Sequence, residues 1–556
     1  FLFPPKQPAP QQSQVAETAQ QAAGQTQAQQ AAPAPVPVSG LDATPGVAAG
    51  GRTLVVDTPL YRAEINSQGG VLERFVLKDY KQSIKPGAAD VDLIGPAAKG
   101  KAPLGLILNV AGAEHHTWTK GDWTTTGDDL DLTGDQTGDL VFTSEIAGMR
   151  VERRLTFSAG TYVIDETATV TNMGDTGLPG TVAFTAAAKS MSAEDNRYNP
   201  TRIAYRSEAE GLEEVTSRDD LEEEGINVTQ DLQWAAIDSN YFIFALVPQQ
   251  GKESLLGRVQ DDVFRLAVSV AANFDPKFAR QVQCSYFLGP MDLDALAKAP
   301  GGLDSAVDFG WFDFLAKPLL IMLDWFYGYV HNYGVAIILL TIVIKILFWP
   351  LSHKSYKSMN QMKKLQPMIA KIKEKHGDDR QKIQQETMQL YKTYKVNPAG
   401  GCMPMLLQIP VFFGLYKALL GAIELRHAVF IEHLPFTDIL WLADLSAKDP
   451  LYITPLIMGA TMFLQQKMTP SAGDPTQQKI MMLMPVVFTF IFLNFPSGLV
   501  IYWLCNNVLS IAQQWWLLRD PKNNPKPEGE KPEKSSAAAK AKDATFTRKS
   551  KKRGRK

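Results

Sequence analysis

The stretch YGVAIILLTIVIKILFWPL, residues 333–351, decides what kind of fold this chain adopts. As a helix it is long enough to cross a bilayer, which takes about 20 apolar residues. It carries one charge, Lys345, and a charge inside a span costs roughly 2.5–3.5 kcal/mol on insertion scales. The ammonium group either faces a polar cavity within the protein or reaches the aqueous boundary near His353 along its flexible stem. The cost of burying the charge favours a functional cation in a cavity.

The composition changes sharply along the 556 residues. Residues 1–50 are rich in Gln, Ala and Pro, which predicts a disordered tether. Residues 51–300 contain many short alternating runs separated by turn signals, such as TYVIDETATVTN, which predicts a large β-sandwich. Apolar runs follow, and a basic tail occupies 519–556. The expected fold is therefore a polytopic α-helical membrane protein with a large extracytoplasmic all-β domain.

The charges next to the apolar runs predict the topology. After the span at 333–351, further spans are expected at 403–423, 451–465, 480–495 and 498–518. The segment 352–398 is strongly basic and has helical apolar spacing, which predicts a cytoplasmic helical hairpin whose second helix is capped by Asp378. The β-domain then lies on the opposite side of the membrane, outside the cytoplasm. Two of the spans are shorter than about 20 residues, which predicts a locally thinned bilayer.

Two further features lie at the start of the helical part and at the start of the chain. Residues 311–330 are apolar but carry three charges and flanking aromatic residues, which predicts an interfacial amphipathic helix. The sequence begins Phe1-Leu2-Phe3 without Met, and we expect a membrane anchor to precede it.

A few polar and aromatic residues lie inside the expected spans. The polar ones either make ordinary hydrogen bonds between helices, which contribute about 0.6 kcal/mol each, or converge with Lys345 on one wet cavity. Several polar groups together with a cation favour the cavity. The predicted substrate groove is formed by Lys345, Thr341, Gln408, Phe412, Tyr502, Trp503 and Asn506.

The end of the chain, RKSKKRGRK, is a dense basic block. Such blocks are usually solvated tails, and on a cytoplasmic terminus RNA phosphates are a reasonable target. The residues expected to contact ribosomal RNA, with no role for DNA, are Arg548, Lys549, Lys551, Lys552, Arg553, Arg555 and Lys556.

No nucleotide-binding motif or metal-ligand spacing is present in the sequence. The pair His115-His116 is too small a signal for a metal site, and the acidic run at 219–224 is typical of a solvated loop. We therefore expect no catalytic residues, no cofactor and no bound metal.

Four segments have a specific resemblance. They are LQPMIAKIKEKHGDDRQKIQQETMQLYK (365–392), YKVNPAGGCMPMLLQIPVFFGLYKAL (394–419), MGATMFLQQKM (458–468) and NFPSGLVIYWLCNN (494–507). Together they resemble the YidC/Oxa family of membrane protein insertases in its Gram-negative form. The β-domain is similar to that family mainly by position, size and the run NSQGGVLERFVL (66–77).

The resemblance implies a protein of the bacterial inner membrane that inserts and helps fold membrane proteins, alone or with a Sec-type translocon. It also implies a positively charged groove open to the cytoplasm and the lipid. Most bacterial relatives have arginine at the position of Lys345, so this chain keeps the charge but loses the two-pronged guanidinium. The implied partners are nascent membrane proteins, the lipid bilayer, the ribosome and Sec-type components.

Two other classes of function remain open from the sequence. A secondary transporter would show inverted repeats among its spans, and none is visible in the five runs. A membrane-anchored carbohydrate-binding or carbohydrate-processing protein would use the sandwich as its working part.

Overall fold

The computed structural model describes residues 41, 47, 50–119, 122–191, 199–229, 231–249, 253–377, 379–394, 396–397, 403–468 and 475–519. The expected tether lies outside these residues, apart from positions 41, 47 and 50. The basic tail from 520 onward, with its seven predicted RNA-contacting residues, also lies outside them.

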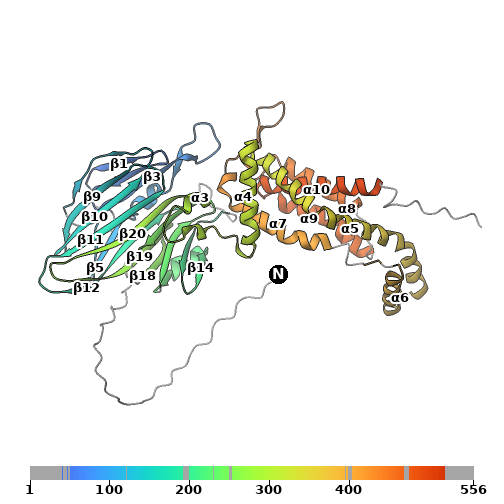
Figure 1. The fold of residues 1–556 in the computed structure, drawn as a ribbon, viewed down its shortest axis with the longest axis horizontal. Helices are drawn as coiled ribbons and strands as arrows, with labels where there is room; N and C mark the ends of the chain where they lie inside the picture. The colour runs from blue at the N-terminus through green and yellow to red at the C-terminus, as the bar shows by residue number, and fades with distance from the viewer. Residues whose placement is uncertain are drawn as a thin grey trace, which may run out of the picture. The chain divides into compact units, whose positions relative to one another are not determined.

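The first part of the chain is a domain of β-sheets (Figure 1). The strands of its largest sheet are β7 (Thr124–Thr126), β9 (Thr137–Ile146), β10 (Met149–Ser158), β11 (Val163–Asn172), β13 (Arg202–Ser207), β14 (Gly211–Val215), β16 (Leu232–Asp238), β17 (Phe242–Pro248) and β20 (Ala279–Pro290). Their order is β14-β13-β16-β17-β20-β11-β10-β9-β7. The neighbours in this sheet are antiparallel, as the alternating sequence runs require.

A second sheet packs against the first. Its strands are β5 (Leu106–Val110), β6 (Ala113–His116), β12 (Leu178–Ala188), β15 (Ile226–Val228), β18 (Glu253–Gln260) and β19 (Val263–Phe274), in the order β15-β18-β19-β12-β5-β6. A third sheet is formed by β1 (Thr53–Asp57), β2 (Tyr61–Asn66), β3 (Val71–Lys81), β4 (Asp90–Asp92) and β8 (Leu130–Asp131). In the second sheet β12 and β19 contact β16 and β17 of the first, so the expected sandwich of sheets is present.

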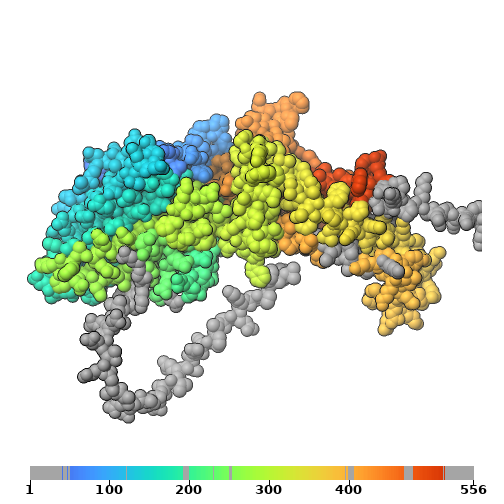
Figure 2. Space-filling model, viewed as in Figure 1, coloured from blue at the N-terminus to red at the C-terminus, as the bar shows by residue number. Residues whose placement is uncertain are grey.

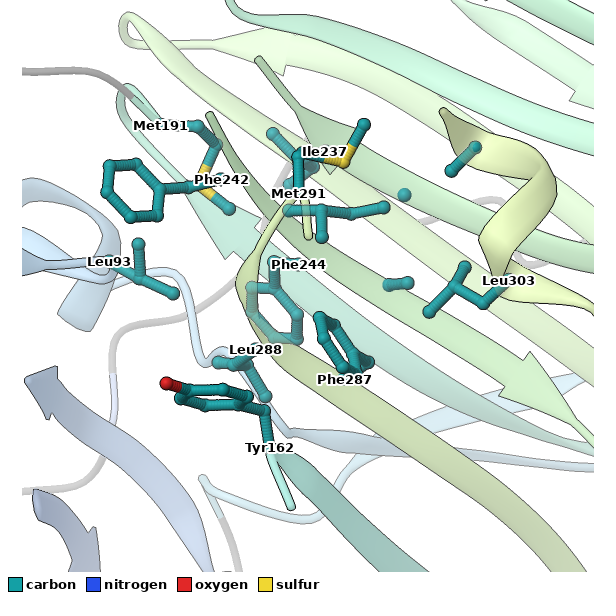
Figure 3. Packing of buried hydrophobic residues seen from close by; sticks show 14 of the residues in the cluster. Leu93, Tyr162, Met191, Ile237, Phe242, Phe244, Phe287, Leu288, Met291 and Leu303 are labelled. Carbon is teal, nitrogen blue, oxygen red and sulfur yellow. The ribbon is translucent and has the colours of Figure 1, made fainter. Parts of the chain in front are cut away.

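The core of this domain is aromatic and aliphatic. In β10 the buried residues Val151, Leu155 and Phe157 alternate with exposed neighbours, the period-2 pattern of a strand with one face covered. Figure 3 shows a second part of the core, where side chains of β17 and β20 meet. There the ring of Tyr162 meets that of Phe287 edge-on, with 6.0 Å between centroids.

A buried ion pair lies inside the sandwich. Arg153 on β10 and Glu166 on β11 are both fully buried, and their Nε and Oε1 atoms are 2.6 Å apart. Arg153 also donates to the carbonyl oxygens of Gly69, in the turn between β2 and β3, and of Leu104, before β5. The Tyr286 hydroxyl donates to Glu166 Oε2 at 2.8 Å. One guanidinium therefore joins the first sheet to segments that belong to the other two.

Short helices connect the strands: α1 (Gly95–Lys99), α2 (Arg218–Glu223), α3 (Leu293–Leu296) and the 3-10 turns η1 (Leu303–Ala306) and η2 (Gly310–Phe312). The acidic run expected in a loop lies largely in α2, so that prediction was wrong in its secondary structure. The side chain of Ser217 accepts a hydrogen bond from the Asp220 amide and caps this helix. Acidic residues in the first turn are favourable at the positive end of a helix.

The rest of the described chain is mainly helical (Figure 1). Its elements are α4 (Asp313–Val330), α5 (Tyr333–His376), α6 (Arg380–Thr393), α7 (Met403–Gly421), η4 (Ile423–Leu425), β21 (Ile431–His433), β22 (Leu440–Leu442), α8 (Ile453–Met468), α9 (Pro475–Phe492) and α10 (Ser497–Arg519). A large all-β domain followed by a helical part is therefore confirmed.

The first expected span and the first arm of the expected hairpin form one uninterrupted helix, α5, of 44 residues. The side chain of Asn332 caps its start by accepting from the Val335 amide at 3.0 Å. The helix ends at Gly377, whose φ of 55° is favourable for glycine. The cap of α6 is Asp379, which accepts from the Lys382 amide, rather than the predicted Asp378, which lies outside the described residues.

Many large apolar side chains of these helices are exposed, for example Leu347 on α5 (72 %) and Phe490 on α9 (68 %). Among the described residues, the one helix long and apolar enough to cross a membrane is the segment Tyr333–Met362 of α5. The apolar parts of α7 and α9, Leu406–Gly421 and Ile480–Phe492, are shorter. Exposed apolar faces of this kind indicate contact with an apolar surrounding.

Candidate functional site

Lys345 lies about three turns into α5 and is half-buried. Its Nζ atom donates to the Oγ atom of Ser510 on α10 at 2.7 Å. In the described part of the chain, no carboxylate lies within ion-pair distance of Lys345. An ammonium group has three donors, so the site retains capacity to bind a further acceptor.

Ser510 links Lys345 to the backbone of α10. Its hydroxyl donates to the Asn506 carbonyl oxygen at 2.7 Å, and its side chain is buried. Because the proton of Ser510 is directed along its own helix, its lone pairs are left to accept from Lys345. Sequence reasoning missed Ser510, although it follows the predicted Asn506 by one helical turn.

A second cluster connects α7 with α10. The Gln408 amide nitrogen donates to Asn506 Oδ1 at 2.9 Å, and the buried Tyr502 side chain also makes a hydrogen bond with Gln408. Asn506 thus bonds to Gln408 through its side chain and to Ser510 through its carbonyl. The structure therefore brings Lys345, Gln408, Asn506 and Tyr502 together on the packed helices α5, α7 and α10.

Thr341 lies on the side of α5 that faces α10. It is fully buried, and its hydroxyl donates to the Ile337 carbonyl oxygen of its own helix at 2.6 Å. Its neighbour across the helix interface is Cys505 of α10. The hydroxyl proton of Thr341 is therefore used within α5, and its role in a substrate groove stays a prediction.

The predicted aromatic residues lie in a larger aromatic cluster. The rings of Phe412 on α7 and Trp503 on α10 meet edge-on, with 4.7 Å between centroids. Trp503 also contacts two rings of α9, those of Phe488 and Phe492. The cluster joins three helices next to the polar groups, so an apolar surface and a hydrogen-bonding surface share α10.

α10 also carries buried amides that the sequence reading did not identify. The Nδ2 atom of Asn507 and the Nε2 atom of Gln513 are buried and have no hydrogen-bond partner in the described structure. The adjacent Gln514 donates through Nε2 to the Met468 carbonyl oxygen at the end of α8. A buried amide donor without a protein acceptor is costly unless water or a polar chain bonds to it.

A metal site finds no support in the described residues, since no group of three or more His, Cys, Asp or Glu side chains could hold an ion. His115 and His116 lie side by side in β6 of the β-domain. The arrangement on α5, α7 and α10 can bind anionic and polar groups through hydrogen bonds and charge.

Comparisons with known proteins cover both parts of the chain. Residues 53–322 match the family model described as the YidC periplasmic domain, and residues 325–524 match the 60Kd inner membrane protein model. The protein from Maridesulfovibrio salexigens named membrane protein insertase YidC is 60 % identical over 528 residues, covering 94 % of this chain and 96 % of the relative. The chain belongs to the YidC family.

Other members are nearly as similar. The YidC insertase of Nitratidesulfovibrio vulgaris is 55 % identical over 470 residues, covering 84 % of this chain and 87 % of the relative. A crystal structure described as an active YidC insertase with the first transmembrane domain resolved is 17 % identical, with a TM-score of 0.36, and covers 86 % of this chain and 95 % of that one. The sequence-based resemblance to the YidC family is thus confirmed by close relatives along nearly the whole chain.

Proposed function

We propose that this chain is a membrane protein insertase and chaperone of the bacterial inner membrane, and that it is not an enzyme. The incoming polar segment binds the groove formed by Lys345, Gln408, Tyr502 and Asn506. The single observation that carries this proposal is Lys345 on an apolar helix, held by Ser510 and, among the described residues, not paired with a carboxylate. The names of the close relatives, all membrane protein insertases, support it.

The proposed topology has five spans, formed by α5, α7, α8, α9 and α10. The basic residues of 352–398 support a cytoplasmic α5–α6 hairpin, and the proposed topology puts the β-domain in the periplasm. The amphipathic helix α4 lies in the outer interface, because Phe314, Trp325 and Tyr329 are exposed on it. The short apolar parts of α7 and α9 support a thinned bilayer around the groove.

In the proposed step, the incoming polar segment exchanges its hydration shell for contacts with the protein. An acidic or polar segment binds the remaining donors of Lys345, which Ser510 holds in place, and bonds to Gln408 and Asn506. The apolar segment that follows it slides into lipid along Phe412 and Trp503. Each apolar residue transferred contributes up to about 0.3–0.6 kcal/mol, which drives the step without a nucleotide.

The partners of the proposed insertase are nascent membrane proteins and the bilayer. We further propose that the basic tail, residues 548–556, contacts ribosomal RNA, and that a Sec-type translocon cooperates with the chain on larger clients. Charge neutralisation on phosphates makes tail binding sensitive to salt and insensitive to RNA sequence.

The deciding experiment is insertion into pure-lipid vesicles that contain only this protein. A small single-span substrate with a short acidic outer segment is added, and external protease follows. We expect a protected fragment that depends on the protein. Absence of that fragment, with the protein correctly oriented, would remove autonomous insertion and leave a role that requires a partner channel.

Ser510→Ala should lower insertion of this acidic substrate about threefold, because a hydrogen bond inside a membrane protein contributes about 0.6 kcal/mol. The loss arises because Lys345 is no longer held toward α10. Ser510→Thr keeps the hydroxyl and should restore the rate. The measurement is the rate of fragment protection for matched acidic and neutral substrates. An equal loss for both would show that Ser510 supports only the fold.

A further inference from the structure

The connection between α7 and α8 ends in an unusually apolar hairpin tip. Strands β21 and β22 flank the sequence LPFTDI, residues 434–439, and Figure 2 shows this segment projecting in orange. Phe436 is completely exposed, and Ile439 is half exposed. Tips of surface hairpins normally carry small polar residues. The exposed side chains of Phe436 and Ile439 at this tip are therefore unfavourable in water.

The backbone at the tip makes Phe436 still less expected. The Thr437 amide donates to the Leu434 carbonyl oxygen at 3.0 Å, which closes a turn with Pro435 and Phe436 as its central residues. Phe436 has φ = 67°, the conformation that the third residue of a type II turn requires. Glycine or asparagine is preferred there, since a Cβ is strained at positive φ. Neither the backbone nor internal packing accounts for phenylalanine at this position.

The base of the hairpin is fixed at the start of α5. The Asn332 side-chain nitrogen donates to the Phe430 carbonyl oxygen at 3.2 Å, and the Phe430 ring lies directly against Gly334. Each strand has three residues, so the tip begins about 10 Å from this base at about 3.4 Å per residue. In the proposed topology the start of α5 marks the outer surface of the membrane.

α4 ends at the same level. Its last residue, Val330, precedes Asn332 by two positions, and its final turns expose Trp325 and Tyr329. Aromatic side chains of this kind favour the headgroup layer of a bilayer. The apolar hairpin tip and the aromatic end of α4 thus border the same end of α5.

We propose that the tip at residues 434–440 inserts into the headgroup layer of the outer leaflet and forms a second interfacial anchor beside α4. Phe436, Ile439 and Leu440 enter the layer, while Thr437 and Asp438 remain with the headgroups. Contact with apolar lipid explains why phenylalanine is kept at a strained, exposed position. The inference rests on the proposed topology.

The test is a fluorescent label at the tip of the full-length protein in vesicles. Cys284, Cys402 and Cys505 are replaced by alanine, and Phe436→Cys is labelled with an environment-sensitive fluorophore. We expect the label to emit at a shorter wavelength than the same fluorophore in aqueous buffer. We also expect nitroxide-labelled lipids to quench it and aqueous iodide to leave it unquenched. Quenching by iodide alone would overturn the inference. Shielding from both quenchers would also overturn it, because a protein partner would then cover the tip.

Two control labels separate this inference from the topology on which it rests. A label at Leu347, which is exposed on α5, should be quenched by lipid nitroxides, and a label at Asp219 in α2 should be quenched by iodide. Failure at Leu347 would contradict the proposed span, whereas failure at residue 436 alone would contradict the anchor. Phe436→Gly relaxes the strained turn, so its melting temperature in detergent should not fall. A large fall would mean that Phe436 has a folding role.

Discussion

Lys345→Gln is expected to reduce insertion of substrates with acidic outer segments about tenfold. Two unit charges 4 Å apart attract by about 4 kcal/mol at an effective dielectric constant of 20, and desolvation offsets much of this. A net loss of about 1.4 kcal/mol corresponds to a factor of ten. Since Ser510 is neutral, removing the ammonium leaves no buried countercharge behind, and the fold should be preserved. The measurement is the initial rate of protease-protected fragment in vesicles.

The controls for this variant come from the same helices. Lys417→Gln removes an equal charge from an exposed position on α7 and should leave the rate unchanged. Lys345→Arg keeps the charge and should retain most activity. Lys345→Ala combined with Gln408→Ala should impair acidic substrates most and neutral ones least. If all substrates inserted normally with the double variant, the cationic groove would play no part in insertion.

Arg153→Met should be the most damaging single change to stability in the described β-domain. Breaking a buried ion pair costs about 3–5 kcal/mol, because one charge stays buried without its partner. Here the carboxylate of Glu166 is the charge left behind. Three carbonyl or carboxylate contacts are lost with Arg153, at Glu166, Gly69 and Leu104. The effect is measured as the melting temperature of the β-domain in the purified full-length chain, with unfolding monitored by proteolysis.

Arg154→Met is the matched control, because Arg154 is the next residue and makes its ion pairs at the surface. Exposed pairs contribute about 0–1 kcal/mol, so the shift should be small. Replacing both Arg153 and Glu166 by methionine removes both charges and should cost less than Arg153→Met alone. Equal destabilisation by Arg153→Met and Arg154→Met would contradict the account of the buried pair.

Patterns that repeat along the chain could be predicted from the sequence. The period-2 alternation of TYVIDETATVTN, residues 161–172, predicted a strand, and β11 covers Val163–Asn172 with alternate residues buried. The same kind of alternation puts Arg153 and Glu166 at inward positions, a signal that sequence reasoning passed over. The composition of 333–351 likewise indicated a long apolar helix, but a sequence read by itself did not show that it continues without a break to His376.

Contacts between distant helices could not be predicted in the same way. Lys345 and Ser510 are 165 positions apart, and their meeting depends on how α5 and α10 are rotated against each other. Serine is common on helices, so nothing marked Ser510 as the partner. The spacing of Thr341 from Lys345 suggested a shared cavity, but it did not show that the Thr341 hydroxyl donates within its own helix. Gln513 and Gln514 are identical neighbours, and only the packed structure shows that the Nε2 atom of Gln514 has an acceptor while that of Gln513 has none among the described residues.

The length of α5 carries it far beyond the position of Lys345. At about 1.5 Å per residue its 44 residues extend roughly 66 Å, about twice the hydrocarbon thickness of a bilayer. Pro350 and Pro367 both lie inside the helix, and each removes a backbone hydrogen bond at a point where a helix can bend. The two prolines divide α5 into three segments, so its end at His376 can change direction without moving the segment that holds Lys345.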